Sequence, residues 1–186
     1  MAIARDEAFA FAYPHLLSGW RRQGASLSFF SPLANEVPAP DADAIFLPGG
    51  YPELHAGRLS QADNFLAGLT QAATRDTLIY GECGGYMVLG HALIDADGIE
   101  HRMADLLPVT TSFARRKLHL GYRHFRHDGA LPWPRVLKGH EFHYSTISRE
   151  DEEMPLFRAE DAAERDLGPM GLRRNRVMGS YAHVIA

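Results

Sequence analysis

The segment Leu78–Tyr86 constrains the fold most, because an apolar run leads directly into Gly81-Glu82-Cys83-Gly84-Gly85. This pattern predicts a strand, a tight turn and a helix. Gly81 and Gly85 lack a Cβ atom, so the backbone can approach closely there. Such a turn is typical of a nucleophile elbow, with Cys83 at a helix N-terminus that favours a thiolate. The N–H of Gly84 is then placed to stabilise an oxyanion.

The rest of the first half alternates predicted strands and helices. Strands are expected at 2–4, 26–30, 44–47 and 77–80, with one helix around Leu16, Leu17 and Trp20 that Gly24 ends. A second helix is expected through Arg75, with Ser60 and Asp63 as a capping-box-like start. Helices between strands imply parallel pairing, so we expect an α/β fold with an open, mostly parallel sheet and flanking helices.

The second half, from about Asp95, shows short strand-like runs instead. These runs lie at 110–113, 118–125, 142–147 and 177–181, and we expect them to add antiparallel strands to the sheet edge. The charge-rich segment 150–166 is expected to form a solvated surface. In open α/β sheets the ligand crevice lies at the carboxyl ends of the strands, where the elbow is predicted.

Composition excludes several classes of protein. The chain has 186 residues, 46% of them apolar, and a net charge of −4, from 19 basic and 23 acidic residues. One domain with a real core fits this length, and a mildly acidic chain is a poor candidate for binding nucleic acid. A single cysteine cannot form an internal disulfide, which favours a reducing cytoplasm. No signal peptide or membrane-spanning segment is apparent, so we expect no membrane partner.

A cysteine nucleophile requires a base, and His183 is the best of the ten histidines. It follows the apolar run Val177–Tyr181 and so comes at the end of a predicted strand. His140 and His143 alternate on a predicted strand, point to opposite faces and make a poor metal pair. His119, His124 and His127 have no clustered cysteine or acidic ligands, and His15, His55, His91 and His101 are read as surface or structural residues. We therefore expect no metal site.

The segment Leu47–Glu53, with sequence LPGGYPE, leaves another predicted strand through Gly49 and Gly50. Such a turn can present a backbone N–H to a ligand. Because its strand neighbours the elbow strand, Gly50 is a plausible second oxyanion donor.

Four motifs occur in order along the chain: LPGGYPE, GECGG, GHEFHYS and GSYAH. Together with the opening AIARDEAFAFAYP and the segments SPLANE and ALIDADG, they resemble the class I glutamine amidotransferase domain of the cobyrinic acid a,c-diamide synthase family. The resemblance covers nearly the whole chain and implies a flavodoxin-like, class I amidotransferase-like fold. The form GHEFHYS favours the a,c-diamide branch over the cobyric acid synthases.

The resemblance implies that residues 1–186 form a glutaminase domain. Cys83, activated by His183, attacks the glutamine side-chain amide, and backbone N–H groups near Gly49, Gly50 and Gly84 bind the oxyanion. Ammonia then passes to a synthetase domain, fused or separate, where ATP and Mg²⁺ activate the a and c carboxylates of cobyrinic or hydrogenobyrinic acid. This chain lacks the phosphate-loop motif. We therefore expect the synthetase domain to lie outside it and no cofactor within it.

One position departs from the family's triad. The acid expected two residues after the histidine is Ile185 here, so the site works as a Cys–His dyad or borrows an acid such as Glu141 or Glu82. A carboxylate near the sulfur opposes thiolate formation, so we expect Glu82 to point away. Three alternatives stay open: a free-standing cysteine hydrolase of the same fold, a non-catalytic module with a buried Cys83, and a glutaminase for another amidation, of the cobyric acid synthase or peptidoglycan-amidating type.

Overall fold

Parallel strands form one half of a ten-stranded sheet, in the order β2-β1-β3-β4-β13. The structure is a computed structural model that describes residues 1–150 and 154–186. The strands are β1 (Ala2–Ala4), β2 (Ser28–Phe30), β3 (Ala44–Leu47), β4 (Leu78–Glu82) and β13 (Val177–Ser180). This order is that of flavodoxin-like, doubly wound sheets. The predicted α/β class and the parallel core of the sheet are therefore confirmed.

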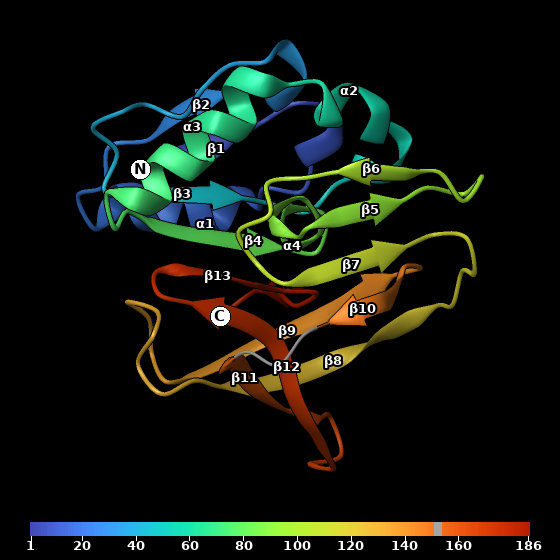
Figure 1. Cartoon of the computed structure of the whole chain (residues 1–186). Helices are drawn as coiled ribbons and strands as arrows, with labels where there is room; N and C mark the ends of the chain where they lie inside the picture. The colour runs from blue at the N-terminus through green and yellow to red at the C-terminus, as the bar shows by residue number, and fades with distance from the viewer. Residues whose placement is uncertain (151–153) are drawn as a thin grey trace.

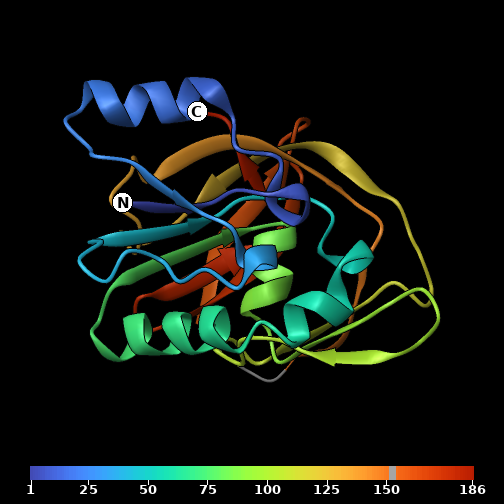
Figure 2. The ribbon, with the colours of Figure 1, turned by 90° about the horizontal axis from the view of Figure 1, so that it is seen from above.

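Helices cover both faces of the parallel strands, with α1 on one side and α3 on the other (Figure 2). Phe46 of β3 faces α1, where its ring meets Trp20 at 5.4 Å, whereas Ile45 and Leu47 pack into the core beneath α3 and α4. Successive side chains of a strand point to opposite faces, so one apolar strand can fill both cores. The helices are α1 (Pro14–Arg22), α2 (Ala56–Ser60), α3 (Asp63–Thr74) and α4 (Gly84–Leu89), with 3-10 turns at Glu7–Phe9, Pro32–Ala34 and Pro52–Leu54.

Antiparallel strands continue the sheet beyond β13, in the order β13-β12-β11-β8-β9-β14. They form the lower half of the molecule in Figure 1. Their bounds are β8 (His119–Arg126), β9 (Val136–His143), β11 (Met154–Asp161), β12 (Asp166–Arg174) and β14 (His183–Val184). The expected antiparallel addition is therefore confirmed for the run 118–125. It is wrong for the run 177–181, because β13 lies inside the sheet, where it pairs in parallel with β4 and is antiparallel only to β12.

A separate four-stranded sheet has the order β10-β7-β5-β6. Its strands are β5 (Ala92–Ile94), β6 (Glu100–Arg102), β7 (Val109–Ser112) and β10 (Thr146–Glu150). The run 110–113, expected at the edge of the main sheet, therefore belongs to a second sheet. The run 142–147, expected as one strand, is divided between the two sheets, because the chain leaves β9 after His143 and enters β10 at Thr146.

Two further local predictions are wrong. Ser60 does not cap α3, since it ends α2 and its hydroxyl donates to the carbonyl of Gly57 at 3.0 Å, while Ala62 stands at the N-cap without a side-chain bond. The charge-rich segment 150–166 is not only solvated surface, because β11 within it buries Leu156 and Phe157. Residues 151–153 of that segment lie outside the described residues. Among the helices described, none has the length and apolar character needed to cross a bilayer.

Candidate active site

The turn between β4 and α4 has the strained geometry of a nucleophile elbow. Cys83 has φ 47° and ψ −104°, a backbone conformation that residues with a side chain rarely adopt. Its N–H donates to the carbonyl of Ser180 on β13 at 2.8 Å, which ties the turn to the neighbouring strand. A Cβ atom at Gly85 would overlap the carbonyl oxygen of Leu47 on β3. The turn therefore packs against β3 only with glycine at this position.

The loop after β3 brings a second backbone N–H to the elbow. A Cβ atom at Gly84 would lie 3.1 Å from the amide nitrogen of Gly50, so the backbones of the two glycines are close neighbours. Gly49 lies against the imidazole of His183, where a Cβ atom would overlap the ring. The segments that follow β3, β4 and β13 therefore meet at one edge of the sheet, as expected for the carboxyl ends of neighbouring parallel strands. The predicted residues Cys83, His183, Gly49, Gly50 and Gly84 all lie at this edge.

His183 is buried, and its position depends on residues far away in the sequence. It pairs with His140 in the β14–β9 ladder, and the two rings stack at 4.8 Å with 10° between their planes. The Tyr13 hydroxyl hydrogen-bonds Nε2 of His140 at 2.8 Å, and the Tyr13 ring lies 6.2 Å from that of His183. Burial, with smaller effects from neighbouring histidines, lowers the pKa of His183 to about 4. The imidazole is therefore neutral at pH 7 and able to accept a proton.

The thiol of Cys83 is also buried, with the residue only 4% exposed. It donates a weak hydrogen bond to the carbonyl oxygen of Phe142 on β9, with the sulfur 3.9 Å from that oxygen. Burial raises the pKa of the thiol to about 12, although a hydrogen bond from the N–H of Gly84 lowers it. The prediction that the helix N-terminus favours a thiolate is therefore wrong, because loss of solvation outweighs that one backbone N–H.

Glu82, the last residue of β4, is buried next to Cys83, and its charge is among the smaller effects that raise the pKa of that thiol. Its Oε1 accepts hydrogen bonds from the Tyr80 hydroxyl at 3.2 Å and from the Val184 N–H at 3.1 Å, next to His183. Its other oxygen, Oε2, is buried without a partner, as is Nδ1 of His183. Burial raises the pKa of Glu82 to about 8, so the group is protonated at pH 7. The carboxyl therefore contacts the backbone of the segment that carries the candidate base.

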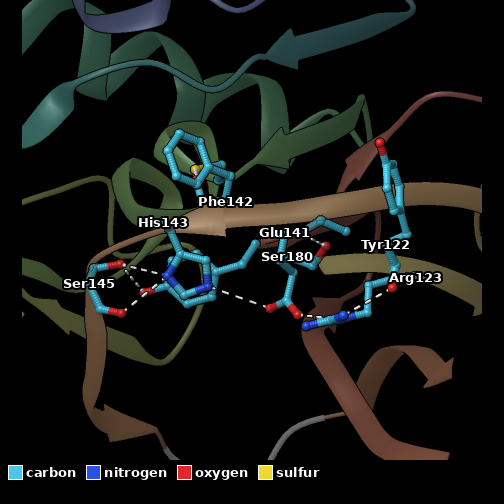
Figure 3. A network of polar contacts seen from close by, with 10 residues as sticks. Tyr122, Arg123, Glu141, Phe142, His143, Ser145 and Ser180 are labelled. Atoms are coloured by element: carbon cyan, nitrogen blue, oxygen red, sulfur yellow. Dashed lines mark hydrogen bonds and ion pairs between the residues drawn. The ribbon is translucent and has the colours of Figure 1, made fainter. Parts of the chain in front are cut away.

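Glu141 belongs to a different polar network, on the face of β9 opposite His140 (Figure 3). Its Oε2 accepts a hydrogen bond from Nε of Arg123 at 2.6 Å, and its Oε1 lies 3.5 Å from Nε2 of His143. The His143 ring stacks on Tyr181 at 3.8 Å, and the Tyr181 hydroxyl accepts a hydrogen bond from Ser145 at 2.9 Å. The structure therefore does not join Glu141 to His183.

A cavity of about 660 Å³ opens beside this network. Glu141, His143, Ser145 and Tyr181 line part of it, and Tyr86 of α4 lines another part. Cys83 is not among the lining residues, but it contributes to the electrostatic environment that raises the pKa of Tyr181. The sulfur is therefore close to the cavity wall without being open to it.

The other histidines have structural partners that agree with their predicted minor roles. His15 contacts the carbonyl of Ile185 at 3.2 Å, His91 contacts Asp105 at 2.8 Å and His101 contacts Asp95 at 2.7 Å. As predicted, His140 and His143 point to opposite faces of β9. In the part of the chain that the structure describes, no group of three His, Cys, Asp or Glu side chains could hold a metal ion.

Tyr13, His140 and Phe142 at this site were not predicted. Alternation along β9 places His140 and Phe142 on one face, which is a signal that the sequence does carry. That His140 stacks on His183 depends on the register between β9 and β14, and no local pattern reveals this register. The contact of Tyr13 likewise depends on how the segment before α1 crosses the end of the sheet.

Comparison with known proteins identifies the family. A family model described as a CobB/CobQ-like glutamine amidotransferase domain matches residues 1–186. The chain belongs to this family. It is 60% identical over 185 residues to the hydrogenobyrinate a,c-diamide synthase of Brucella abortus, covering 100% of this chain and 42% of that protein. It is 56% identical to the protein of the same name from Rhizobium meliloti, covering 99% of this chain and 43% of the relative.

The resemblance to the a,c-diamide synthase branch is therefore confirmed, and the chain spans less than half the length of these curated relatives. Solved structures agree with the fold. A glutamine amidotransferase from Thermotoga maritima superposes with a TM-score of 0.63 at 14% identity, covering 98% of this chain and 74% of that one. The glutaminase domain of Trypanosoma brucei CTPS with bound acivicin gives a TM-score of 0.54 at 12% identity, covering 98% and 82%. These likenesses confirm the predicted class I amidotransferase-like fold.

Proposed function

We propose that this chain hydrolyses glutamine through a thioester on Cys83 and releases ammonia for an amidation. The strained elbow carries the proposal, because it sets Cys83 beside the backbone amides of Gly84 and Gly50 and near the neutral imidazole of His183. A backbone strained in this way is a typical feature of functional sites. Family membership and the buried neutral base support the same chemistry.

In the proposed reaction, the Cys83 sulfur attacks the side-chain carbonyl carbon of glutamine while the thiol proton passes to His183. The carbonyl oxygen becomes an oxyanion that the N–H groups of Gly84 and Gly50 stabilise. The imidazolium returns the proton to the nitrogen, the C–N bond breaks and ammonia leaves a γ-glutamyl thioester. Water, deprotonated by His183, then adds to the thioester and releases glutamate and the free thiol.

Because the thiol and the imidazole are both neutral, the mechanism requires the proton to leave Cys83 only as the sulfur attacks the substrate. With pKa values of about 12 for Cys83 and about 4 for His183, the two side chains do not form a thiolate–imidazolium pair before substrate binds. The proton transfer therefore accompanies attack on the substrate, and the charge that develops is balanced by the oxyanion donors. A site that stays uncharged until substrate binds is also protected from oxidation of the thiol.

Glu82 is the acid that we propose to support His183, in place of the residue expected at position 185. Its Oε1 accepts a hydrogen bond from the N–H of Val184, which fixes the backbone next to the base. Glu141, the other acid considered, is committed to Arg123 and His143. The chain therefore uses a Cys–His pair with a positioning carboxyl from the elbow strand.

We further propose that the ammonia amidates the a and c carboxylates of a corrinoid, hydrogenobyrinic or cobyrinic acid, in a cytoplasmic protein. The names of the most similar relatives support this acceptor, and their greater length supports a second part that binds ATP, Mg²⁺ and the corrinoid. In this reading residues 1–186 are the glutaminase domain. In the second part, ATP would activate each carboxylate by transferring a phosphoryl group to it, and ammonia would displace phosphate to form the amide.

A glutamate-release assay with matched variants tests the proposed hydrolysis. Cys83→Ala should abolish glutamate release and the trapping of a γ-glutamyl thioester, with an unchanged unfolding transition. His183→Ala should slow thioester formation about 10²- to 10⁴-fold if it is the general base. Glutamate release that survives Cys83→Ala would overturn the mechanism.

A further inference from the structure

Apolar side chains form a continuous exposed surface on β8 and β9. The register pairs Leu120 with Phe142 and Tyr122 with His140, so these side chains share one side of the ladder. Leu120 is 64% exposed and Tyr122 is 72% exposed. Leu118 and Tyr144 are exposed beside them, and the Tyr144 ring contacts that of Phe142 at 5.9 Å. We call Leu118, Leu120, Tyr122, Phe142 and Tyr144 the apolar face.

The apolar face lies on the same side of β9 as the candidate catalytic pair. In Figure 3 the rings of Phe142 and Tyr122 project to one side of β9, and the side chains of Glu141 and Arg123 project to the other. The Phe142 carbonyl is 3.9 Å from the sulfur, and His140, the cross-strand neighbour of Tyr122, stacks on His183. The apolar face is therefore the exposed surface of β8 and β9 on the side that carries the neighbours of the candidate base.

A contiguous patch of large apolar side chains is unusual on a surface that stays in water, and it is typical of an interface. Tyrosine and phenylalanine are also the residue types enriched at interface centres. Phe29, Ile99 and Leu167 are also exposed, but they lie away from β8 and β9. Five large, exposed apolar side chains therefore lie together on β8, β9 and their ends beside the active site, which indicates that another protein surface covers them.

We propose that the apolar face is the docking surface for the ATP-dependent synthetase part of the longer protein. The proposal rests on the proposed glutaminase function. This chain covers only 42% of the Brucella abortus relative, so more than half of such a protein is available to cover the face. Docking there would place the consumer of ammonia directly over its source and keep water away from the path. A second copy of this chain would leave the released ammonia without an acceptor.

Site-specific thiol labelling tests the contact without depending on activity. The experiment uses the chain together with its synthetase part, as one polypeptide or as two coexpressed subunits, and reads each position by mass spectrometry. Tyr122→Cys should react with a maleimide several-fold more slowly than Ile99→Cys, because only position 122 lies under the partner. Both positions are exposed in this chain, so both substitutions should leave the fold intact. Equal labelling rates would overturn the proposal.

A coupling measurement tests the consequence for ammonia transfer. In the same intact protein, Leu120→Asp and Tyr122→Asp should lower the ratio of amide formed to glutamate released, while amidation from added ammonium and glutamine hydrolysis persist. The matched control Ile99→Asp should keep the wild-type ratio. An unchanged ratio in both variants, or an equal loss in the control, would overturn the proposal. A dimer of this chain that covers the apolar face in the intact protein would also overturn it. Failure of the glutaminase proposal is distinct, because wild-type protein would then release no glutamate.

Discussion

Replacing Glu82 by glutamine should stabilise the protein, even though it removes a carboxyl from the candidate active site. Glu82 is 1% exposed, and burial raises its pKa from the ordinary 4.5 to about 8. The native protein therefore holds a proton at pH 7 that the unfolded chain has lost. At pH 7, which is 2.5 units above the pKa of Glu82 in the unfolded chain, keeping this proton destabilises the native protein by about 3 kcal/mol. Glutamine is neutral at every pH and avoids this cost.

The glutamine side chain should also fit, since its carbonyl oxygen can accept both bonds that Oε1 accepts from Tyr80 and Val184. Its amide nitrogen would occupy the place of Oε2, which has no partner either. The raised pKa determines the sign of the pH dependence. The stability associated with protonated Glu82 is fully present below pH 4.5 and is lost as the pH rises through about 8. The advantage of Glu82→Gln should therefore be small near pH 4.5 and grow towards pH 8.

Urea unfolding at pH 5, 6, 7 and 8 measures this difference, with the free energy of unfolding of wild type and variant compared at each pH. Glu141→Gln is the matched control. Its carboxylate is paired with Arg123, and its lowered pKa means that the same substitution should destabilise the protein at pH 7. A variant Glu82→Gln that is less stable than wild type at pH 8, or a difference that does not change with pH, would show that native Glu82 is ionised. Loss of glutamate release in this more stable variant would support its positioning role.

Three further outcomes follow from the site geometry. The Cys83→Gly variant should be about 1 kcal/mol more stable than Cys83→Ala in thermal or urea unfolding, because only glycine adopts the positive φ without strain. At most positions alanine is the more stable of the two, and that order here would mean that the elbow is unstrained. Glutamate release should stay nearly constant from pH 7 to 5 and fall towards pH 4, where His183 becomes protonated; a midpoint near 6.5 would contradict burial of the base. Arg123→Met should destabilise the fold by about 3 kcal/mol, since Glu141 keeps a buried charge without its partner; a change below 1 kcal/mol would show that water solvates this carboxylate.

Local patterns in the sequence were enough to predict the parallel core and its elbow. The apolar runs at β1, β3 and β4 and the glycines around Cys83 act over a few residues, so periodicity and turn chemistry identify them. The carboxyl ends of parallel strands meet at one edge, and this rule predicted that Cys83 and Gly50 lie together. His183 follows β13, whose parallel pairing with β4 the sequence did not predict. Ser60 misled the prediction of the α3 start, because the short helix α2 uses its hydroxyl instead.

Tertiary structure decided the electrostatics and the surroundings of the site. Whether Cys83 is a thiolate depends on how much water reaches it, and Phe142 and His140 arrive there only through pairing of β9 with β8 and β14. The pairing of β8 with β9 also brings Arg123 to Glu141, whereas Glu82 of β4 accepts a hydrogen bond from the N–H of Val184, next to the base. Burial and long-range register arise from contacts between residues tens of positions apart, and a local pattern of residues does not encode them.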